Sequence, residues 1–172
     1  MEAEKWKPVT GLIAEIKKCE RVGATTAAVA MAYICIDTMA FLALPAGKEK
    51  QGPNEFIEWC DKYLQACADQ PYKYRGIDVY GARNALLHVF GSEVEYHDKV
   101  PQAKKFGYHD GGEHTYDPTQ DERLVIIGTA SFINDVVRAV SAFMEACKAD
   151  ADLRVRVEGR LPQLLATFAV QA

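Results

Sequence analysis

The sequence predicts an all-α protein, a bundle of five to six helices with a small β-hairpin or loop excursion. Several segments place apolar residues at steps of three and four, which is the helical period. The most apolar stretch, residues 27–44, is short for a membrane span and holds Asp37 near its centre, so it suits a buried helix. A chain of 172 residues fits one domain spanning residues 1–172.

Composition narrows the class of protein. Hydrophobic residues make up 49% and charged residues 26%, as in ordinary globular proteins. The net charge of -4 argues against a protein that clamps duplex DNA, so any nucleic-acid contact must be local. Five cysteines without a CxxC pair argue against disulfides and zinc ribbons. The N-terminus lacks an apolar signal core, and we expect a cytoplasmic protein with no membrane partner.

The first two helices are predicted over residues 9–21 and 25–44. The first alternates apolar and charged residues at helical spacing. Thr25 or Thr26 can cap the second, which is apolar on most sides and should lie centrally in the fold.

Two further helices follow a polar loop at 45–53 that is rich in proline and glycine. Asn54 can cap the third helix, whose apolar face continues to residue 67. The fourth helix is predicted over 77–91, where Gly91 ends it.

Residues 92–128 differ from the rest and are expected to form a polar insertion. The stretch 103–109 can face 123–127 in a β-hairpin turned by Gly111-Gly112. So long a loop in a compact domain usually carries function or mobility.

The C-terminal part predicts one clear helix and one less defined segment. Ser131 opens the clear helix, with apolar residues at steps of three and four up to Cys147. Residues 152–168 alternate like a strand at first, but Asp150 or Asp152 can cap a helix there, which we favour.

Three polar side chains interrupt the fourth helix. Asn84 and His88 lie one turn apart on the same face, and Arg83 can fold across towards them. The opposite arc of this helix is apolar and should face the core, and it comprises Ala85, Leu86, Val89 and Phe90.

This trio suits cleavage of a phosphodiester. A guanidinium matches phosphate oxygens and can stabilise charge on the phosphorus. An imidazole exchanges protons near neutral pH, and Asn84 can orient the ring or bind phosphate. With RNA, the adjacent 2′-hydroxyl can attack without a metal or cofactor, leaving a 2′,3′-cyclic phosphate and a 5′-hydroxyl.

Arg83-Asn84-x-x-x-His88 resembles the R-x(4–6)-H motif of the HEPN superfamily, including the polar residue that often follows its arginine. The resemblance implies a small helical bundle, a homodimer whose two motif helices form one cleft, and catalytic roles for Arg83 and His88 with Asn84 auxiliary. It also implies a metal-independent endoribonuclease acting on single-stranded RNA, such as the toxin of a toxin–antitoxin pair with an antitoxin protein as partner.

An alternative function needs no catalysis. HEPN folds also occur as modules that dimerise or bind a nucleotide or a partner. Arg83 can pair with a buried acid such as Asp37, and His88 can satisfy a backbone carbonyl. Asp37 itself can either orient the motif residues or simply bond a neighbouring helix.

Two other groups of side chains could form sites. The first could bind a divalent metal or be a solvated polar loop, and it comprises His97, His109 and His114 with Asp98, Asp110 and Glu113. The second could stack on bases or pack onto helix ends, and it comprises Tyr72, Lys73, Tyr74 and Arg75. We expect no metal site in either group.

Overall fold

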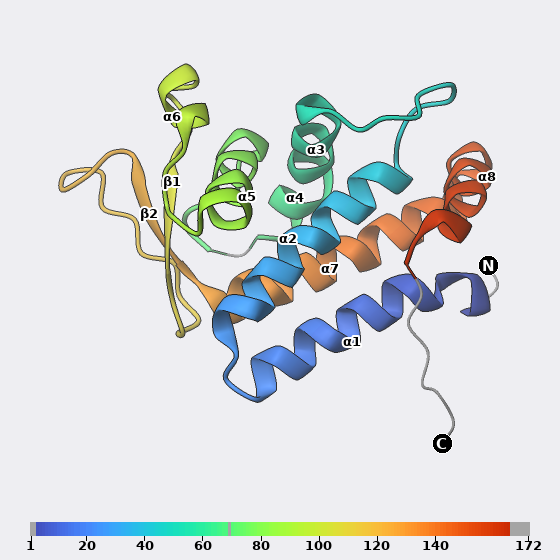
Figure 1. The fold of residues 1–172 in the computed structure, drawn as a ribbon, viewed down its shortest axis with the longest axis horizontal. Helices are drawn as coiled ribbons and strands as arrows, with labels where there is room; N and C mark the ends of the chain where they lie inside the picture. Colours follow the sequence, from blue (N-terminus) through green and yellow to red (C-terminus); the bar gives the residue numbers. More distant parts are fainter. Residues whose placement is uncertain (1–2, 69, 166–172) are drawn as a thin grey trace.

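The computed structural model describes residues 3–68 and 70–165, which form a mainly α-helical fold with a small parallel sheet (Figure 1). The larger helices are α1 (Lys7–Arg21), α2 (Thr25–Leu42), α3 (Pro53–Trp59), α5 (Gly76–Val89), α7 (Thr129–Ala149) and α8 (Ala151–Arg160). The shorter elements are η1 (Ala3–Trp6), η2 (Cys60–Leu64), α4 (Gln65–Cys67), α6 (Glu95–Lys99), β1 (Lys105–His109), β2 (Leu124–Gly128) and η3 (Leu161–Gln163).

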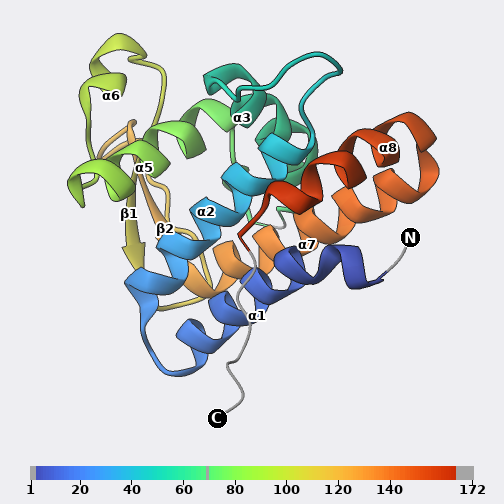
Figure 2. The ribbon, with the colours of Figure 1, turned by 45° about the vertical axis from the view of Figure 1, so that its right-hand side comes forward.

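Helix α2 is the centre of the fold, as its composition predicts. It contacts α1, α3, α5, α7 and α8, and both ribbon views show it crossing the middle of the molecule (Figures 1 and 2). By length and composition α2 could cross a membrane, but half of it is buried inside this protein. That burial is typical of a core helix whose apolar residues pack on all sides.

The predicted N-terminal caps of α2 and α3 are wrong. The N-cap of α2 is Ala24, with no side-chain cap, so neither Thr25 nor Thr26 caps it. Gly52 precedes α3, and its N–H donates to Glu55 Oε2 at 2.7 Å, so the first turn is stabilised by this carboxylate rather than by Asn54. The helix then continues through a π-helical turn, η2, into α4.

The expected β-hairpin is also wrong, because β1 and β2 pair in parallel, with Phe106 opposite Val125. After β1 the chain doubles back along β2, where Thr115 and Ile126 exchange backbone hydrogen bonds of 2.8 and 2.9 Å. Strand β2 is thus paired on both edges. Its nearly continuous apolar run, Leu124 to Ile127, suits such an interior strand.

The two C-terminal helices agree better with their patterns. Helix α7 begins two residues before Ser131, after Gly128. Helix α8 confirms the helical alternative for residues 152–168: the Asp150 carboxylate accepts from Leu153 N–H at 2.9 Å. The helix ends at Arg160, and residues 166–168 of the expected segment lie outside the described residues.

A buried carboxylate, Asp78, fixes the start of α5. It accepts the Tyr72 hydroxyl at 2.6 Å, Arg75 Nε at 2.9 Å and Nη2 at 2.7 Å, and the Lys104 backbone N–H at 2.8 Å. Four donors satisfy the oxygens of a side chain that has no exposed surface. The first turn of α5 is thereby joined to the segment that leads into β1.

A second buried polar chain connects α7 with the sheet. The Tyr74 hydroxyl donates to Asp135 Oδ2 at 2.9 Å, and His114 Nε2 lies 2.5 Å from the same hydroxyl oxygen. Gly128 N–H donates to His114 Nδ1 at 3.0 Å, so in the neutral ring the proton lies on Nε2 and is donated to Tyr74. Burial lowers the pKa of His114, which favours this neutral form.

Candidate active site

Helix α5 carries the candidate residues, and glycine allows its close approach to α3. A Cβ on Gly76 would lie 2.3 Å from the backbone oxygen of Ile57, so only glycine fits without a shift. Gly76 N–H also donates to Asp61 Oδ1 at 2.5 Å. These contacts fix where α5 begins and therefore where its side chains point.

The structure brings Arg83, Asn84 and His88 together, as the spacing predicts. Arg83 Nη1 donates to Asn84 Oδ1 at 2.9 Å and lies 3.0 Å from His88 Nε2. A guanidinium can only donate, so His88 Nε2 accepts and the neutral ring carries its proton on Nδ1. His88 is exposed and Arg83 is partly exposed, so both groups are reachable from solvent.

Asp37 of α2 holds the guanidinium from the other side. Arg83 Nε donates to Asp37 Oδ2 at 2.8 Å, and Gln51 Nε2 donates to Asp37 Oδ1 at 3.2 Å. Burial raises the pKa of Asp37, while Arg83 and Gln51 act in the opposite direction. The pair is about a quarter exposed on each side, at 22% for Arg83 and 25% for Asp37.

The end of α5 departs from the expected apolar arc. Ala85 is buried, but Val89 is 60% and Phe90 76% exposed. The helix ends at Val89, and Phe90 adopts a left-handed conformation (φ 53°). The Gly91 N–H donates to Ala85 O at 3.0 Å, which satisfies one of the last carbonyls of the helix. Because the chain turns away here, these two side chains leave the core face.

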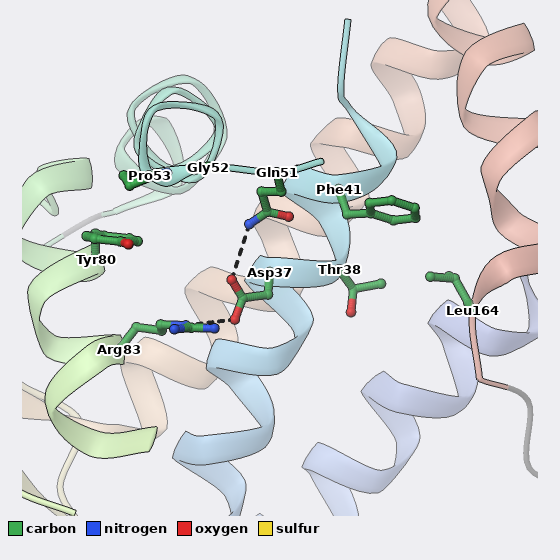
Figure 3. Close-up of a pocket in the computed structure, with 9 residues that line it drawn as sticks. All are labelled: Asp37, Thr38, Phe41, Gln51, Gly52, Pro53, Tyr80, Arg83 and Leu164. Atoms are coloured by element: carbon green, nitrogen blue, oxygen red, sulfur yellow. Dashed lines mark hydrogen bonds and ion pairs between the residues drawn. The ribbon is translucent and has the colours of Figure 1, made fainter. Parts of the chain in front are cut away.

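An open pocket of about 530 Å³ lies beside this trio, on the Asp37 side (Figure 3). Asp37 and Thr38 face it from α2, Gln51 from the preceding loop of α3, and Tyr80 and Arg83 from α5. Phe41, Gly52, Pro53 and Leu164 complete its wall. The pocket thus combines an aromatic ring, a guanidinium, a carboxylate and an amide.

The aromatic–basic segment before α5 is not available for stacking on bases. Tyr72 and Tyr74 are buried, and their hydroxyls bind Asp78 and Asp135. Arg75 forms a bidentate pair with Asp78. The alternative of tyrosines packed onto helix ends is confirmed for this segment.

The three insertion histidines do not converge on a metal site. His97 is fully buried against Gly81, and His114 belongs to the Tyr74–Asp135 chain. His109 Nε2 lies 2.6 Å from the backbone oxygen of Glu113, and its Nδ1 accepts from Gly111 N–H. Across residues 3–68 and 70–165, no group of three or more histidine, cysteine, aspartate or glutamate side chains could hold a metal ion.

Two residues of the site carried no prediction from the sequence. Tyr80 lies three residues before Arg83 on the same helix face, and that spacing could have placed it beside Arg83. Gln51 comes from a polar loop whose path no local pattern specifies, so no sequence signal pointed to it.

No family model, curated protein or solved structure matches this chain.

Proposed function

We propose that this chain is a metal-independent endoribonuclease that cleaves single-stranded RNA through attack by the 2′-hydroxyl. The observation that supports it is the 3.0 Å approach of Arg83 Nη1 to His88 Nε2 on a solvent-exposed helix edge. A cation for phosphate and an imidazole for proton transfer are the two groups that this reaction needs. The proposal includes a single HEPN-like helical bundle and a cytoplasmic location.

The roles of the residues follow from their contacts. An incoming phosphate competes with His88 for the Arg83 guanidinium, which frees the Nε2 lone pair. His88 Nε2 then takes the 2′-hydroxyl proton while the 2′-oxygen bonds to phosphorus. The phosphorus–5′-oxygen bond breaks, and the 5′-oxygen takes a proton from a water molecule. The hydroxide that is left takes the proton from His88, which restores the neutral imidazole. Asn84 positions the guanidinium through its 2.9 Å bond to Nη1.

A homodimer is part of this proposal. Val89 and Phe90 follow His88 directly and expose apolar side chains to solvent. A second copy that covers them brings its own α5 next to the first, so two trios share one cleft. An antitoxin protein that covers the same edge would block the cleft.

The second candidate is a helical module without catalysis that dimerises or binds a nucleotide or partner. The specific observation in its favour is the ion pair of Arg83 with Asp37, which joins α5 to α2 and gives the arginine a structural role. This candidate predicts altered stability or assembly after substitution of Arg83, and no cleavage of RNA.

The test is cleavage of a single-stranded RNA containing every dinucleotide, with a chelator present. We expect cut RNA bearing 2′,3′-cyclic phosphate ends, detected by mass spectrometry. His88→Ala should lower the rate by about 10²–10⁴-fold. Arg83→Ala should lower it by about 10²–10³-fold.

Matched controls separate chemistry from general loss of charge. Arg154→Ala removes an arginine from α8, at the other end of the molecule, and His109→Gln removes a histidine outside the trio (Figure 1). Both should keep wild-type rates. Full activity in both Arg83→Ala and His88→Ala, or cleavage of a 2′-deoxy strand, contradicts the proposal. Inactive wild-type protein favours the second candidate.

A further inference from the structure

The pocket beside Arg83 has the chemistry of a base-reading site. Its volume of about 530 Å³ lies within the usual range for small-ligand sites, roughly 300–1,000 Å³. Arg83, the residue that the proposed reaction assigns to the phosphate, lines this pocket. A nucleotide whose phosphate lies on Arg83 therefore has its base within reach of this hollow.

Tyr80 supplies a fixed aromatic surface. Its ring is packed edge-on against Phe56 of α3, with centroids 5.5 Å apart, and against Tyr96 of α6, at 5.1 Å. Two such neighbours hold the ring in one orientation. Figure 3 shows Tyr80 reaching into the pocket on the same side of α5 as Arg83. A ring held in this way can stack on a base with little loss of entropy.

The polar wall opposite Tyr80 presents acceptors. Each Asp37 oxygen accepts one hydrogen bond, Oδ1 from Gln51 at 3.2 Å and Oδ2 from Arg83 at 2.8 Å, and a carboxylate can accept about four. Gln51 Nε2 points at Asp37, so its Oε1 acceptor is left for a ligand. The wall therefore suits a partner with adjacent N–H donors.

Among the four RNA bases, guanine matches this wall best. Its N1–H and N2–H₂ are adjacent donors that a carboxylate can take together. Adenine and cytosine place a single amine beside a ring acceptor, and uracil has one N–H between two acceptors. A base that leaves these polar groups without partners binds less tightly.

We infer that the pocket of Asp37, Gln51 and Tyr80 is a guanine-selective subsite for the RNA strand. This inference rests on the proposed ribonuclease function.

Nucleotide binding tests the pocket without requiring cleavage. The full-length chain is titrated with 3′-GMP, 3′-AMP, 3′-CMP and 3′-UMP by calorimetry. We expect 3′-GMP to bind at least about tenfold more tightly than the others, the discrimination of one bidentate pair. Equal affinity for the four nucleotides, or no binding, overturns the inference.

Variants locate the binding. Tyr80→Leu removes the ring and should weaken 3′-GMP binding at least about fivefold, whereas Tyr80→Phe keeps the ring and should stay within about twofold. Gln51→Leu, in a surface loop, should reduce the preference for 3′-GMP over 3′-AMP without affecting folding. Circular dichroism confirms that each variant is folded. Unchanged 3′-GMP affinity in both Tyr80→Leu and Gln51→Leu overturns the inference.

The two proposals fail in different ways. If selective 3′-GMP binding occurs but RNA stays intact, the ribonuclease proposal fails and the guanine pocket stands. If RNA is cut at all bases equally and no nucleotide is preferred, the pocket inference fails and the ribonuclease stands. Cuts mapped next to guanines, together with selective binding, support both.

Discussion

Asp78→Ala tests the buried carboxylate that fixes α5. This side chain has no exposed surface and accepts four hydrogen bonds, from Tyr72, twice from Arg75 and from the backbone of Lys104. Removing the acceptor leaves the buried Tyr72 hydroxyl and the Lys104 N–H without a partner. Arg75 is 39% exposed, so its guanidinium regains water and adds little to the cost.

The expected loss follows from these contacts. Two donors left unpaired cost about 1–3 kcal/mol each. We therefore expect Asp78→Ala to lower the free energy of unfolding by about 2–6 kcal/mol, a large part of the about 5–15 kcal/mol typical of a domain. Asp78→Asn keeps one acceptor oxygen and should lose about half as much.

Urea unfolding at neutral pH, followed by the helical circular dichroism signal, measures both losses. Asp110→Ala is the matched control, because Asp110 is exposed in a loop, and it should stay within about 0.5 kcal/mol of wild type. If the free energy of unfolding of Asp78→Ala lies within about 1 kcal/mol of the wild-type value, the buried Asp78 acceptor does not stabilise the fold as argued. If it does not fold, Asp78→Asn still provides the comparison.

Three further predictions concern single positions. Gly76→Ala should destabilise the protein by about 1–3 kcal/mol in thermal unfolding, because the new Cβ meets the Ile57 backbone at 2.3 Å; an unchanged melting temperature contradicts that clash. Asp37 has a folded-state pKa raised by burial, so its contribution to stability is full below the unfolded pKa and is lost as pH rises. Wild type should therefore gain stability relative to Asp37→Asn when urea unfolding is repeated at pH values from about 7 down to about 4. A loss of relative stability over the same range contradicts a raised folded-state pKa of Asp37. Phe90→Gly relieves the left-handed strain and should stabilise the monomer by about 1 kcal/mol while weakening self-association in sedimentation; stronger association argues against the proposed dimer edge.

Helices were predictable because their signals are local. The apolar periods placed α1, α2, α5 and α7 to within a few residues, and Asp150 marked the start of α8. The parallel sheet was not predictable in the same way. Its two strands are separated by a segment that itself pairs with β2, and nothing in the 110–123 sequence distinguishes that path from a hairpin.

In the candidate site, too, contacts within one helix were predictable from the sequence, whereas the conformation at the helix end was not. Arg83, Asn84 and His88 share one helix, so their spacing alone predicts that they meet. The contact of Arg83 with Asp37 was among the alternatives, because an aspartate in an apolar helix needs a partner. The exposure of Val89 and Phe90 depends on a left-handed residue that is usually glycine, so the pattern misplaced them.

Helix α5 is fixed firmly at its N-terminal end and loosely at its C-terminal end. The Asp78 carboxylate and the close contact of Gly76 with the Ile57 backbone hold the N-terminal end, whereas Val89 and Phe90 at the C-terminal end are exposed. Amide exchange should therefore be slowest near Tyr80 and fastest beyond His88. In the proposed reaction, the base would stack on the rigid first half of α5, and the phosphorus would react beside its more mobile C-terminal end.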